Sequence, residues 1–305
     1  MGVERPGNKR GILHRGFFVF ALLCVLVWLS GCQSTDILQI ADFPSAEQLP
    51  EHITLVSWNA QKGGDVRFRG DVTRLLAQHD PDFVLMQEAT EDLLQHQGIG
   101  GHFAGSWRYP FPKGPTIGLM TLSKVPPGQL MPLPTRHREF FITAPKLSLA
   151  TKYPLADGRN LLLINVHILA FERGRNKAVA EQLQGLKAVM LAHEGPIILA
   201  GDFNTWNRQR LAMLEQLAGE LGLTEVAGFP GGRRTGGTGY RWADKVCGIS
   251  WSLPLDRIYY RGFSAYSAEV LSYDSSDHAA LLVRLALQVD LESNVDVSRV
   301  GGLAR

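Results

Sequence analysis

The chain has 305 residues, 45% hydrophobic and 20% charged, which suits one large globular domain or two small ones. The formal net charge is +2, but residues 1–31 contain four basic residues and one acidic residue, so the rest of the chain holds 27 basic and 28 acidic residues and has a net charge of −1. A net charge so close to zero argues against tight, nonspecific binding of nucleic acid. It does not exclude a local basic groove on the surface.

The N-terminus has the pattern of a bacterial export signal. Basic residues up to Arg15 precede thirteen apolar residues at 17–29, a run that suits a signal peptide and is short for a membrane-spanning helix. The run ends in "LSGC", which resembles the lipobox of bacterial lipoproteins, where the cysteine, here Cys32, is lipidated and becomes the first residue. The alternative is an uncleaved, short membrane anchor. The lipoprotein is preferred because a plain anchor does not require two small residues followed by cysteine.

These features predict the organisation of the chain. Residues 1–31 are interpreted as a signal peptide, 32–50 as a polar tether, 51–289 as the folded domain and 290–305 as a flexible tail with few large apolar residues. We expect the mature protein to be an exported monomer, anchored to a membrane of a bacterial envelope by the lipid. Beyond the first 32 residues, Cys247 is the single cysteine, so no disulfide framework and no cysteine-rich metal site is expected.

The folded region opens with a β-α-β pattern. Segments 52–59 and 82–89 have the composition of strands, and the segment 67–80 between them has apolar residues at helical spacing and stops before Pro81. The two strands are therefore expected to be parallel neighbours in one sheet.

The rest of the chain also combines strands with helices. Segment 116–124 predicts a strand, and 146–167 predicts a hairpin that turns at Asp157-Gly158. The remaining predicted elements are a helix with an apolar stripe at 179–190, a strand in 197–204, a helix at 208–221, a loop at 230–239 and strands within 254–262 and 277–287.

Several strand-like runs end in, or lie beside, polar residues suited to binding metal or phosphate. Strand ends in layered α/β folds form sites because the sheet holds the side chains rigidly while the ends face a crevice. Each residue alone has an ordinary explanation as a turn former, a hydrogen-bonded histidine or a cap. Together, that explanation needs a separate coincidence at each strand end, so we interpret them as one site. These residues are Asn59, Glu88, Asn165, His167, Asp202, Asn204, Asp256, Asp277 and His278.

The residue types at this site indicate a hard cation. Carboxylates with amides and imidazoles, and without thiolates, suit Mg²⁺, with Mn²⁺ as the alternative, whereas Zn²⁺ more often uses clustered histidine and cysteine. The glycine-rich stretch 230–239 neither follows a strand nor precedes the lysine of a phosphate-binding loop, so a flexible surface loop is the preferred interpretation. Within it, Arg233 and Arg234 are candidate contacts to an anionic substrate.

The motifs resemble those of the endonuclease/exonuclease/phosphatase family, which has the deoxyribonuclease I-like fold. They occur in the family's order over about residues 53 to 287, and the combination of "GDFN" and "SDH" with an upstream "QE" is specific although each alone is weak. The resemblance implies an α/β fold, a four-layer α/β/β/α sandwich in which two packed mixed β-sheets are flanked by helices. The site is then expected at one end, between the sheets. The matching motifs are "SWN", "QE", "NVH", "GDFN", "LDRIYY" and "SDH".

The resemblance also implies cleavage of a phosphoester with a divalent cation, usually Mg²⁺. It implies that Glu88 is the main metal ligand, with Asn59 beside it and Asp277 as a candidate ligand at a second position. Such hydrolysis needs a cation to neutralise developing charge, a polarised water and donors to the nonbridging oxygens.

The remaining residues receive catalytic or phosphate-binding roles from the same resemblance. Asp202 orients or deprotonates the attacking water, and Asn204 and His167 hold the phosphate. His278, paired with Asp256, contacts the phosphate or acts as the general base instead. A carboxylate beside His278 would raise the pKa of the imidazole and favour a protonated His278 that binds phosphate. The sequence leaves open whether Asp202 or His278 accepts the proton of the attacking water.

The leading hypothesis is an exported, membrane-tethered, metal-dependent phosphoesterase that is nuclease-like and cleaves phosphodiester bonds. The basic stretches at 136–138 and 172–177 are candidate phosphate contacts, although a solvated surface is the preferred interpretation. Phospholipid head groups and small phosphorylated metabolites are alternative substrates. A non-catalytic module that binds phosphorylated ligands is the alternative from another class, and the presence of Glu88, Asp202 and His278 argues against it.

Overall fold

The computed structural model describes residues 36–93, 99–108, 116–139, 145–172, 174–227, 229, 236–237 and 252–288. The chain divides into two units, Met1–Ser34 and Thr35–Arg305, and every described residue belongs to the second unit. The expected signal peptide, Cys32, the loop arginines Arg233 and Arg234, and the predicted C-terminal tail lie outside the described residues. No helix in the described part of the chain has the length and apolar character needed to cross a membrane.

One half of the domain is a seven-stranded mixed sheet with the order β1-β4-β5-β3-β2-β15-β14. The neighbours β2 and β3 run parallel, as the β-α-β pattern predicts, and the other pairs in this sheet are antiparallel. Its strands are β1 (Ile37–Ala41), β2 (His52–Asn59), β3 (Phe83–Thr90), β4 (Gly100–Arg108), β5 (Thr116–Ser123), β14 (Phe263–Leu271) and β15 (Ala280–Leu287).

The other half is a six-stranded mixed sheet with the order β10-β13-β9-β8-β7-β6, in which β8 and β9 run parallel. Its strands are β6 (Gln129–Arg138), β7 (Pro145–Pro154), β8 (Asn160–His167), β9 (Ile197–Asp202), β10 (Thr224–Glu225) and β13 (Asp256–Arg261). A separate two-stranded ladder pairs β11 (Gly236–Gly237) with β12 (Ser252–Leu253), so part of the predicted loop at 230–239 is a short strand.

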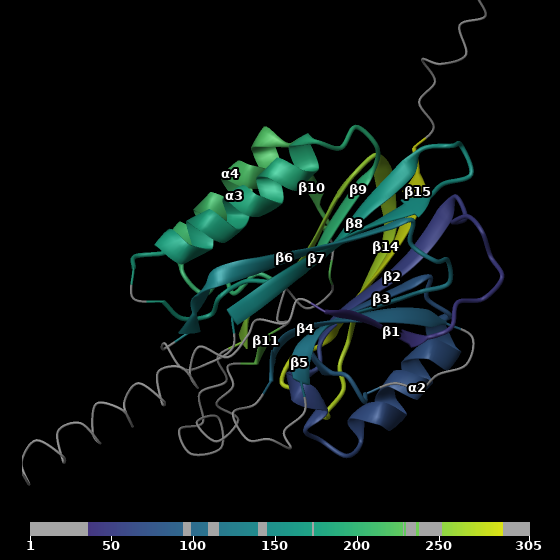
Figure 1. The fold of residues 1–305 in the computed structure, drawn as a ribbon, viewed down its shortest axis with the longest axis horizontal. Helices are drawn as coiled ribbons and strands as arrows, with labels where there is room; N and C mark the ends of the chain where they lie inside the picture. The colour runs from purple at the N-terminus through teal and green to yellow at the C-terminus, as the bar shows by residue number, and fades with distance from the viewer. Residues whose placement is uncertain are drawn as a thin grey trace, which may run out of the picture. The chain divides into compact units, whose positions relative to one another are not determined.

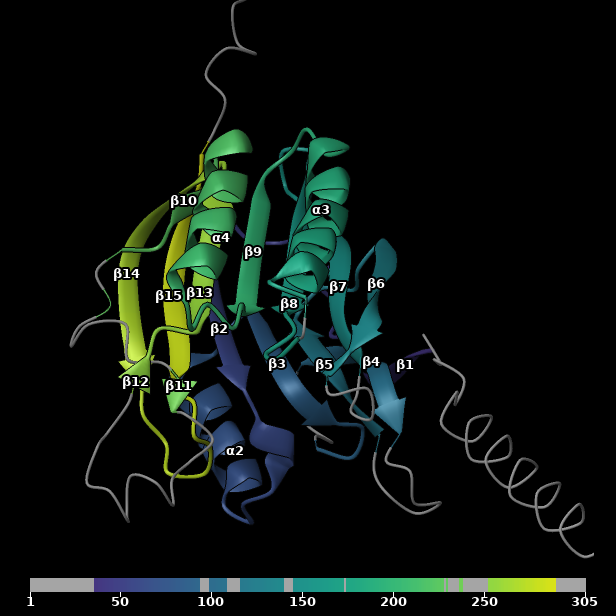
Figure 2. The same cartoon turned by 90° about the vertical axis from the view of Figure 1, so that its left-hand side faces the viewer.

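The two sheets pack face to face, and helices cover both outer faces (Figures 1 and 2). Helices α3 (Lys177–Leu191) and α4 (Arg208–Glu220) pack on the six-stranded sheet, and α2 (Phe68–His79) packs on the seven-stranded sheet. This arrangement confirms the expected four-layer α/β/β/α sandwich. Side chains from both sheets form the core between them, including Ile53, Leu55, Leu161, Leu163, Ile198, Ala200, Ile258, Leu281 and Val283.

The segment expected as a tether contains a strand. β1 pairs antiparallel with β4, with Ile37 opposite Ala104 and Leu38 opposite Phe103. Farther along, Leu49 is buried and its backbone nitrogen donates to Pro154 O at 3.1 Å. The prediction that all of 32–50 is a tether is therefore wrong. Five residues are too short a run to show a strand pattern, and β1 forms because the edge of β4 offers backbone partners.

Three further strands of more than two residues, β4, β6 and β14, were not among the predicted elements. β6 contains Pro132 and Pro134, which weaken the sequence signal for a strand and are tolerated because β6 is the edge of its sheet. β4 includes three glycines, and β14 is only partly buried, so neither shows a clear alternation of buried and exposed residues.

Gly201 allows β9 to approach β8 closely. Its φ is 145°, in the region that side-chain-bearing residues rarely adopt, and a Cβ there would lie 2.0 Å from Val166 O. A glycine immediately before Asp202 is therefore a requirement of the sheet.

We expect Gly201→Ala to lower the free energy of unfolding by about 2 kcal/mol or more, because the added methyl group meets backbone that cannot move without breaking the ladder. Urea denaturation measures the change. Gly185→Ala is the matched control, since a Cβ at this exposed position of α3 meets nothing within 4 Å and a helical alanine is favoured over glycine. Equal unfolding free energies for the two variants would contradict the explanation.

Candidate active site

The inner face of the six-stranded sheet becomes polar at the ends of β8, β9 and β13. Alternate residues of a strand point to the same face, so His167 continues the inner row of leucines in β8 and Asp202 continues the inner row of β9. The strand register sets His167 opposite Asp202, and Asp202 opposite Asp256. Three polar side chains from neighbouring strands therefore lie side by side where the apolar core between the sheets ends.

Asn59 joins this row from the other sheet. It lies at the end of β2, and its Nδ2 donates to Asp202 Oδ2 at 3.0 Å. Its Oδ1 accepts from the backbone nitrogen of Gln61 at 3.0 Å, which holds the amide in this orientation. The site thus lies between the two sheets, as the resemblance implied.

Glu88 reaches the site through an irregularity in β3. Its neighbours Met86 and Ala89 both pack on the outer side of the sheet, and the pairing of β3 with β5 shifts register between them. Glu88 itself has a φ of 49°, a left-handed conformation that costs an ordinary residue about 1–3 kcal/mol. The resulting bulge turns the carboxylate inward, with Oε1 3.2 Å from Lys146 Nζ and 3.9 Å from His167 Nε2.

The turn after β9 is held by its own side chains. Asp202 Oδ1 accepts from the backbone nitrogen of Asn204 at 3.0 Å, and Asn204 Nδ2 donates to Ile168 O at 2.9 Å. Asn204 has a φ of 48°, which asparagine tolerates better than most residues. These bonds tie the "GDFN" turn to the segment that follows His167 in β8.

The segment before β15 completes the site. His278 Nδ1 lies 2.7 Å from Asp256 Oδ2, and both side chains are buried. Ser276 Oγ donates to Asn59 O at 2.7 Å, which fixes this segment against the end of β2. Asp277 Oδ1 lies 4.0 Å from His278 Nε2. The structure therefore brings together the predicted residues from all six motifs.

Two of these groups have pKa values well below the ordinary range. Burial opposes ionisation of Glu88, but the positive charges of Lys146, His167 and Lys62 lower its pKa to about 2. Burial and the charge of Lys146 lower the pKa of His167 to about 4, against the opposite effect of Asp202 and Glu88. Glu88 is thus an anion at neutral pH, and His167 is a neutral imidazole.

His278 has the opposite character. Burial alone would lower its pKa, but Asp256, with help from Asp202 and Asp277, raises it to about 10. Burial raises the pKa of Asp256 to about 6, against the stabilising effect of His278. The hydrogen bond between the two residues keeps a proton on Nδ1, so we describe them at neutral pH as an imidazolium paired with a carboxylate.

The cluster of potential ligands that lie closest together does not suit a metal. Among the described residues, ligand atoms of Asp202, Asp256 and His278 all lie within 4.8 Å of one another. A protonated imidazole has no lone pair to offer a cation, and His278 is already paired with Asp256. His278 is the member of this cluster that can donate a hydrogen bond to an oxyanion, through Nε2.

The oxygen-rich side of the site fits a hard divalent cation. Glu88 is ionised, and burial first, then the negative charges of Glu88 and Asp202, raises the pKa of Asp277. A divalent cation would relieve this repulsion among buried carboxylates, and with Asn59 the donor set consists of carboxylate and amide oxygens. Glu88, Asn59 and Asp277 are therefore chemically suited to hold it.

Asn165, which the strand-end pattern also singled out, has a structural role. Its Nδ2 donates to Met86 O at 3.2 Å and Met120 O at 3.1 Å, in strands of the opposite sheet, and its Oδ1 accepts from Gln87 Nε2 at 2.8 Å. The side chain is buried and satisfies polar groups between the sheets. It cross-links the two sheets beneath the site.

The structure adds positioning residues that carried no motif. Lys146 on β7 contacts Glu88, and Gln182 on α3 donates to His167 O at 3.0 Å. Arg210 on α4 is 1% exposed, and its Nη1 donates to Leu169 O at 2.6 Å and Asn204 O at 3.1 Å. A basic residue on a polar helix looks solvated in sequence, and only the packing of α4 shows that Arg210 is buried.

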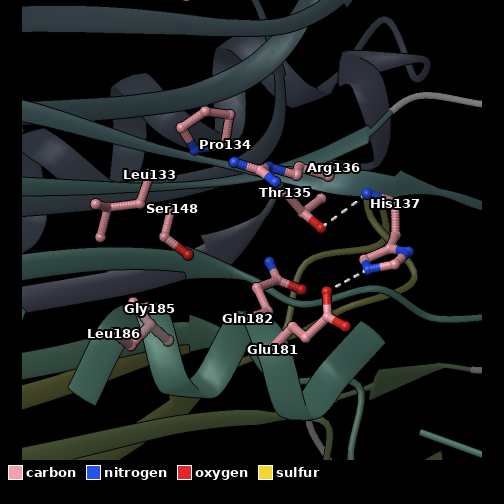
Figure 3. A pocket seen from close by; sticks show the side chains of 10 residues that line it. All are labelled: Leu133, Pro134, Thr135, Arg136, His137, Ser148, Glu181, Gln182, Gly185 and Leu186. Atoms are coloured by element: carbon pink, nitrogen blue, oxygen red, sulfur yellow. Dashed lines mark hydrogen bonds and ion pairs between the residues drawn. The ribbon is translucent and has the colours of Figure 1, made fainter. Parts of the chain in front are cut away.

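A cavity of about 230 Å³ lies between β6 and α3, and its lining includes none of the predicted site residues (Figure 3). His137 and Glu181 meet at its rim, with Nε2 2.6 Å from Oε2, and Ser148 lies at its floor. None of the residues that line it carries a predicted catalytic or metal-binding role. The basic stretch at 136–138 thus takes part, through His137, in a hydrogen bond with α3.

Comparison with known proteins agrees with this geometry. The chain is 32% identical over 241 residues to a UPF0294 protein of Klebsiella pneumoniae (strain 342), which covers 77% of this chain and 83% of that protein. An endonuclease/exonuclease/phosphatase structure from Bacteroides vulgatus superposes with a TM-score of 0.59 at 15% identity, covering 78% of this chain and 99% of that one. The human Nocturnin catalytic domain with bound sulfate gives a TM-score of 0.55 at 18% identity, with 83% and 97% covered.

The likeness to these two structures shows a shared fold, whereas a match to a family's sequence profile shows the family. The profile of the Endonuclease/Exonuclease/phosphatase family matches residues 56–278, a range that begins in β2 and ends at His278. It therefore spans both sheets and every residue of the site described above. The chain belongs to the endonuclease/exonuclease/phosphatase family.

Proposed function

We propose that this protein is a divalent-metal-dependent phosphoesterase that cleaves phosphodiester bonds, in the manner of a nuclease, by attack of water. One observation carries the proposal: anionic Glu88 and cationic His278 lie in one site with the carboxylate of Asp202. His167 Nε2 lies 3.9 Å from Glu88 Oε1 and 3.6 Å from Asp202 Oδ2. A phosphodiester has negative nonbridging oxygens and needs both cationic partners and an activated water. Membership of a family of phosphoester hydrolases supports the same chemistry.

The charges assign the roles of the residues around Asp202. A His278 that already holds a proton binds a phosphate oxygen and does not accept a proton from water. Asp202 is then the group that orients and deprotonates the water, while its bonds from Asn59 and Asn204 keep the carboxylate in place. The charge of His278 therefore supports Asp202 as the general base in this proposal.

His167 and Asn204 complete the phosphate-binding side. His167 is neutral, so its ring donates one hydrogen bond without adding charge, and Gln182 holds the backbone on which it lies. The Asn204 amide has a second hydrogen beyond the one donated to Ile168 O. Glu88, with Asn59 and Asp277, would hold the cation, for which we propose Mg²⁺ or Mn²⁺; when bound, it neutralises charge that develops on the phosphate.

Export and membrane attachment are a second part of the proposal. The basic stretch, the apolar run at 17–29 and the "LSGC" sequence support a lipoprotein anchored through Cys32. We expect Cys32→Ala to abolish incorporation of labelled fatty acid and to move the protein from the membrane to the soluble or unprocessed fraction of a bacterial host. Retention of the label by the variant would contradict lipidation at Cys32.

We expect Asp202→Asn to lower kcat/KM on a phosphodiester at least about 100-fold, because the isosteric amide cannot accept a proton. Steady-state assays of the full chain with Mg²⁺ and Mn²⁺ measure this on plasmid DNA, RNA, sphingomyelin and a small phosphomonoester, and EDTA is expected to abolish turnover. Asp92→Asn is the matched control, since Asp92 is exposed and pairs with Arg69.

The same series separates the alternatives. Preferential turnover of sphingomyelin or the monoester would replace the nuclease-like assignment by a lipid or metabolite phosphoesterase. A folded wild type that turns over none of the substrates would favour a module that only binds phosphorylated ligands. An Asp202→Asn variant with wild-type rates would contradict the role of Asp202 in catalysis.

We expect His167 to make stability fall on acidification. Its folded pKa of about 4 lies below the ordinary value of 6.5, so between these values the unfolded chain binds the proton first and folding is weakened as pH falls. The unfolding free energy of the wild type relative to His167→Gln should therefore drop by about 3 kcal/mol from pH 7 to pH 4. Urea denaturation of both proteins across this range measures it, and parallel pH profiles would show that His167 is not held neutral.

A further inference from the structure

An aromatic pair is exposed beside the site. Six large hydrophobic side chains are exposed in the described part of the chain, and two of them, Phe171 and Trp206, lie against each other. Their ring centroids are 6.4 Å apart with an interplanar angle of 35°, and they are 43% and 42% exposed. Exposed aromatic surface of this kind costs solvation free energy, so a contact with a ligand would be favourable.

The pair lies on the two segments that carry the phosphate-binding residues. Phe171 follows His167 by four residues, and Trp206 follows Asn204 by two. Successive Cα atoms are about 3.8 Å apart, so the Cα of Trp206 lies within about 8 Å of the Cα of Asn204. Trp206 Nε1 donates to Ala170 O at 2.8 Å, which joins the two segments.

The indole ring is held rigidly. The Arg210 guanidinium lies 4.9 Å from the centroid of the Trp206 ring, and Arg210 is buried. One face of the ring therefore covers Arg210, and the exposed surface belongs to the other side. A ring fixed by a hydrogen bond and a cation–π contact loses little freedom when a flat ligand stacks on it.

The charges beside this pair are of both signs. Glu139 Oε1 accepts from the backbone nitrogen of Ala170 at 2.6 Å, and Glu172 Oε1 lies 4.0 Å from Arg210 Nη2.

The exposed charges at the start of α3 and α4 are basic. Asn176 Nδ2 donates to Gln209 Oε1 at 2.9 Å, so the sequence neighbours of these two residues meet at the start of α3 and α4. The exposed residues next to this contact are Arg175, Lys177 and Arg208. Three cations at the start of these two helices, one of them two residues after Trp206, suit a ligand that combines flat bases with a phosphate backbone.

We infer that Phe171 and Trp206 form a stacking site for a nucleobase next to the scissile phosphodiester, which makes single-stranded nucleic acid the substrate class. The inference rests on the proposed function and names its substrate. A base in a duplex is stacked and paired internally, so only an unpaired base can reach the rings.

A lipid surface is the less suitable partner for these side chains. More than half of each ring is buried, and Trp206 is bonded to backbone, so neither ring protrudes as a side chain that inserts between acyl chains would. A zwitterionic head group also has no net charge, whereas a nucleic-acid backbone carries a negative charge at every phosphate and matches a group of exposed cations better.

The test compares a single-stranded oligonucleotide with an abasic oligomer of the same length, using the full chain and Mg²⁺ or Mn²⁺. We expect Phe171→Leu to lower the ratio of kcat/KM for the base-bearing over the abasic substrate about tenfold, because leucine keeps apolar surface but cannot stack. Phe171→Tyr should restore the ratio, and Trp206→Phe should lower it less than Trp206→Leu. Tyr266→Leu is the control, since Tyr266 is an exposed aromatic residue on β14 outside the site, and both substrates should be cleaved at wild-type rates.

An unchanged ratio in Phe171→Leu, or a wild type that prefers duplex to single strands, would overturn the inference. So would a Phe171→Leu effect confined to sphingomyelin vesicles, which would assign the rings to a lipid. If the wild type cleaves no phosphodiester, the proposed function fails separately, and anisotropy of a labelled oligonucleotide in EDTA still decides the inference. Weaker binding by Phe171→Leu would then support stacking, and equal binding would overturn it.

Discussion

The register of β8, β9 and β13 is the constraint on which the site depends. It sets His167, Asp202 and Asp256 in one row on the inner face, and Gly201 lets β9 come close enough to β8 for that row to form. Because side chains alternate between faces, a slip of one residue would send the same groups toward the helices and bury them among apolar side chains. Stability of the sheet and placement of the catalytic groups are therefore one requirement.

The site that this sheet positions contains buried charges of both signs. Glu88 is held as an anion, and His278 as a cation, within a space that burial makes unfavourable for both. Buried charges of this kind rarely add stability over apolar residues, so their presence is best understood through the reaction. Asp202 lies close to His278 and His167 in this space, which is consistent with its proposed role in orienting the water.

The helical layer supports the same chemistry from outside. Gln182 on α3 binds the backbone at the end of β8, and Arg210 on α4 binds the backbone after β8 and β9. These segments carry both the proposed phosphate-binding residues and the exposed rings. A site held by packed helices can be rigid although its residues lie on turns. Substrate choice and catalysis would thus depend on one pair of neighbouring turns.

Much of this protein is determined locally in its sequence. The central strands, the three helices and the polar residues at strand ends are visible because a two- or 3.6-residue period and a chain of motifs are properties of short segments. Other features depend on pairing between distant segments: the strand β1, the bulge that turns Glu88 inward, and the contact of Phe171 with Trp206. Local patterns specify which residues can take part, whereas the charge of His278, the burial of Arg210 and the exposure of the two rings were decided by tertiary packing, because each is a property of neighbours that are remote in sequence.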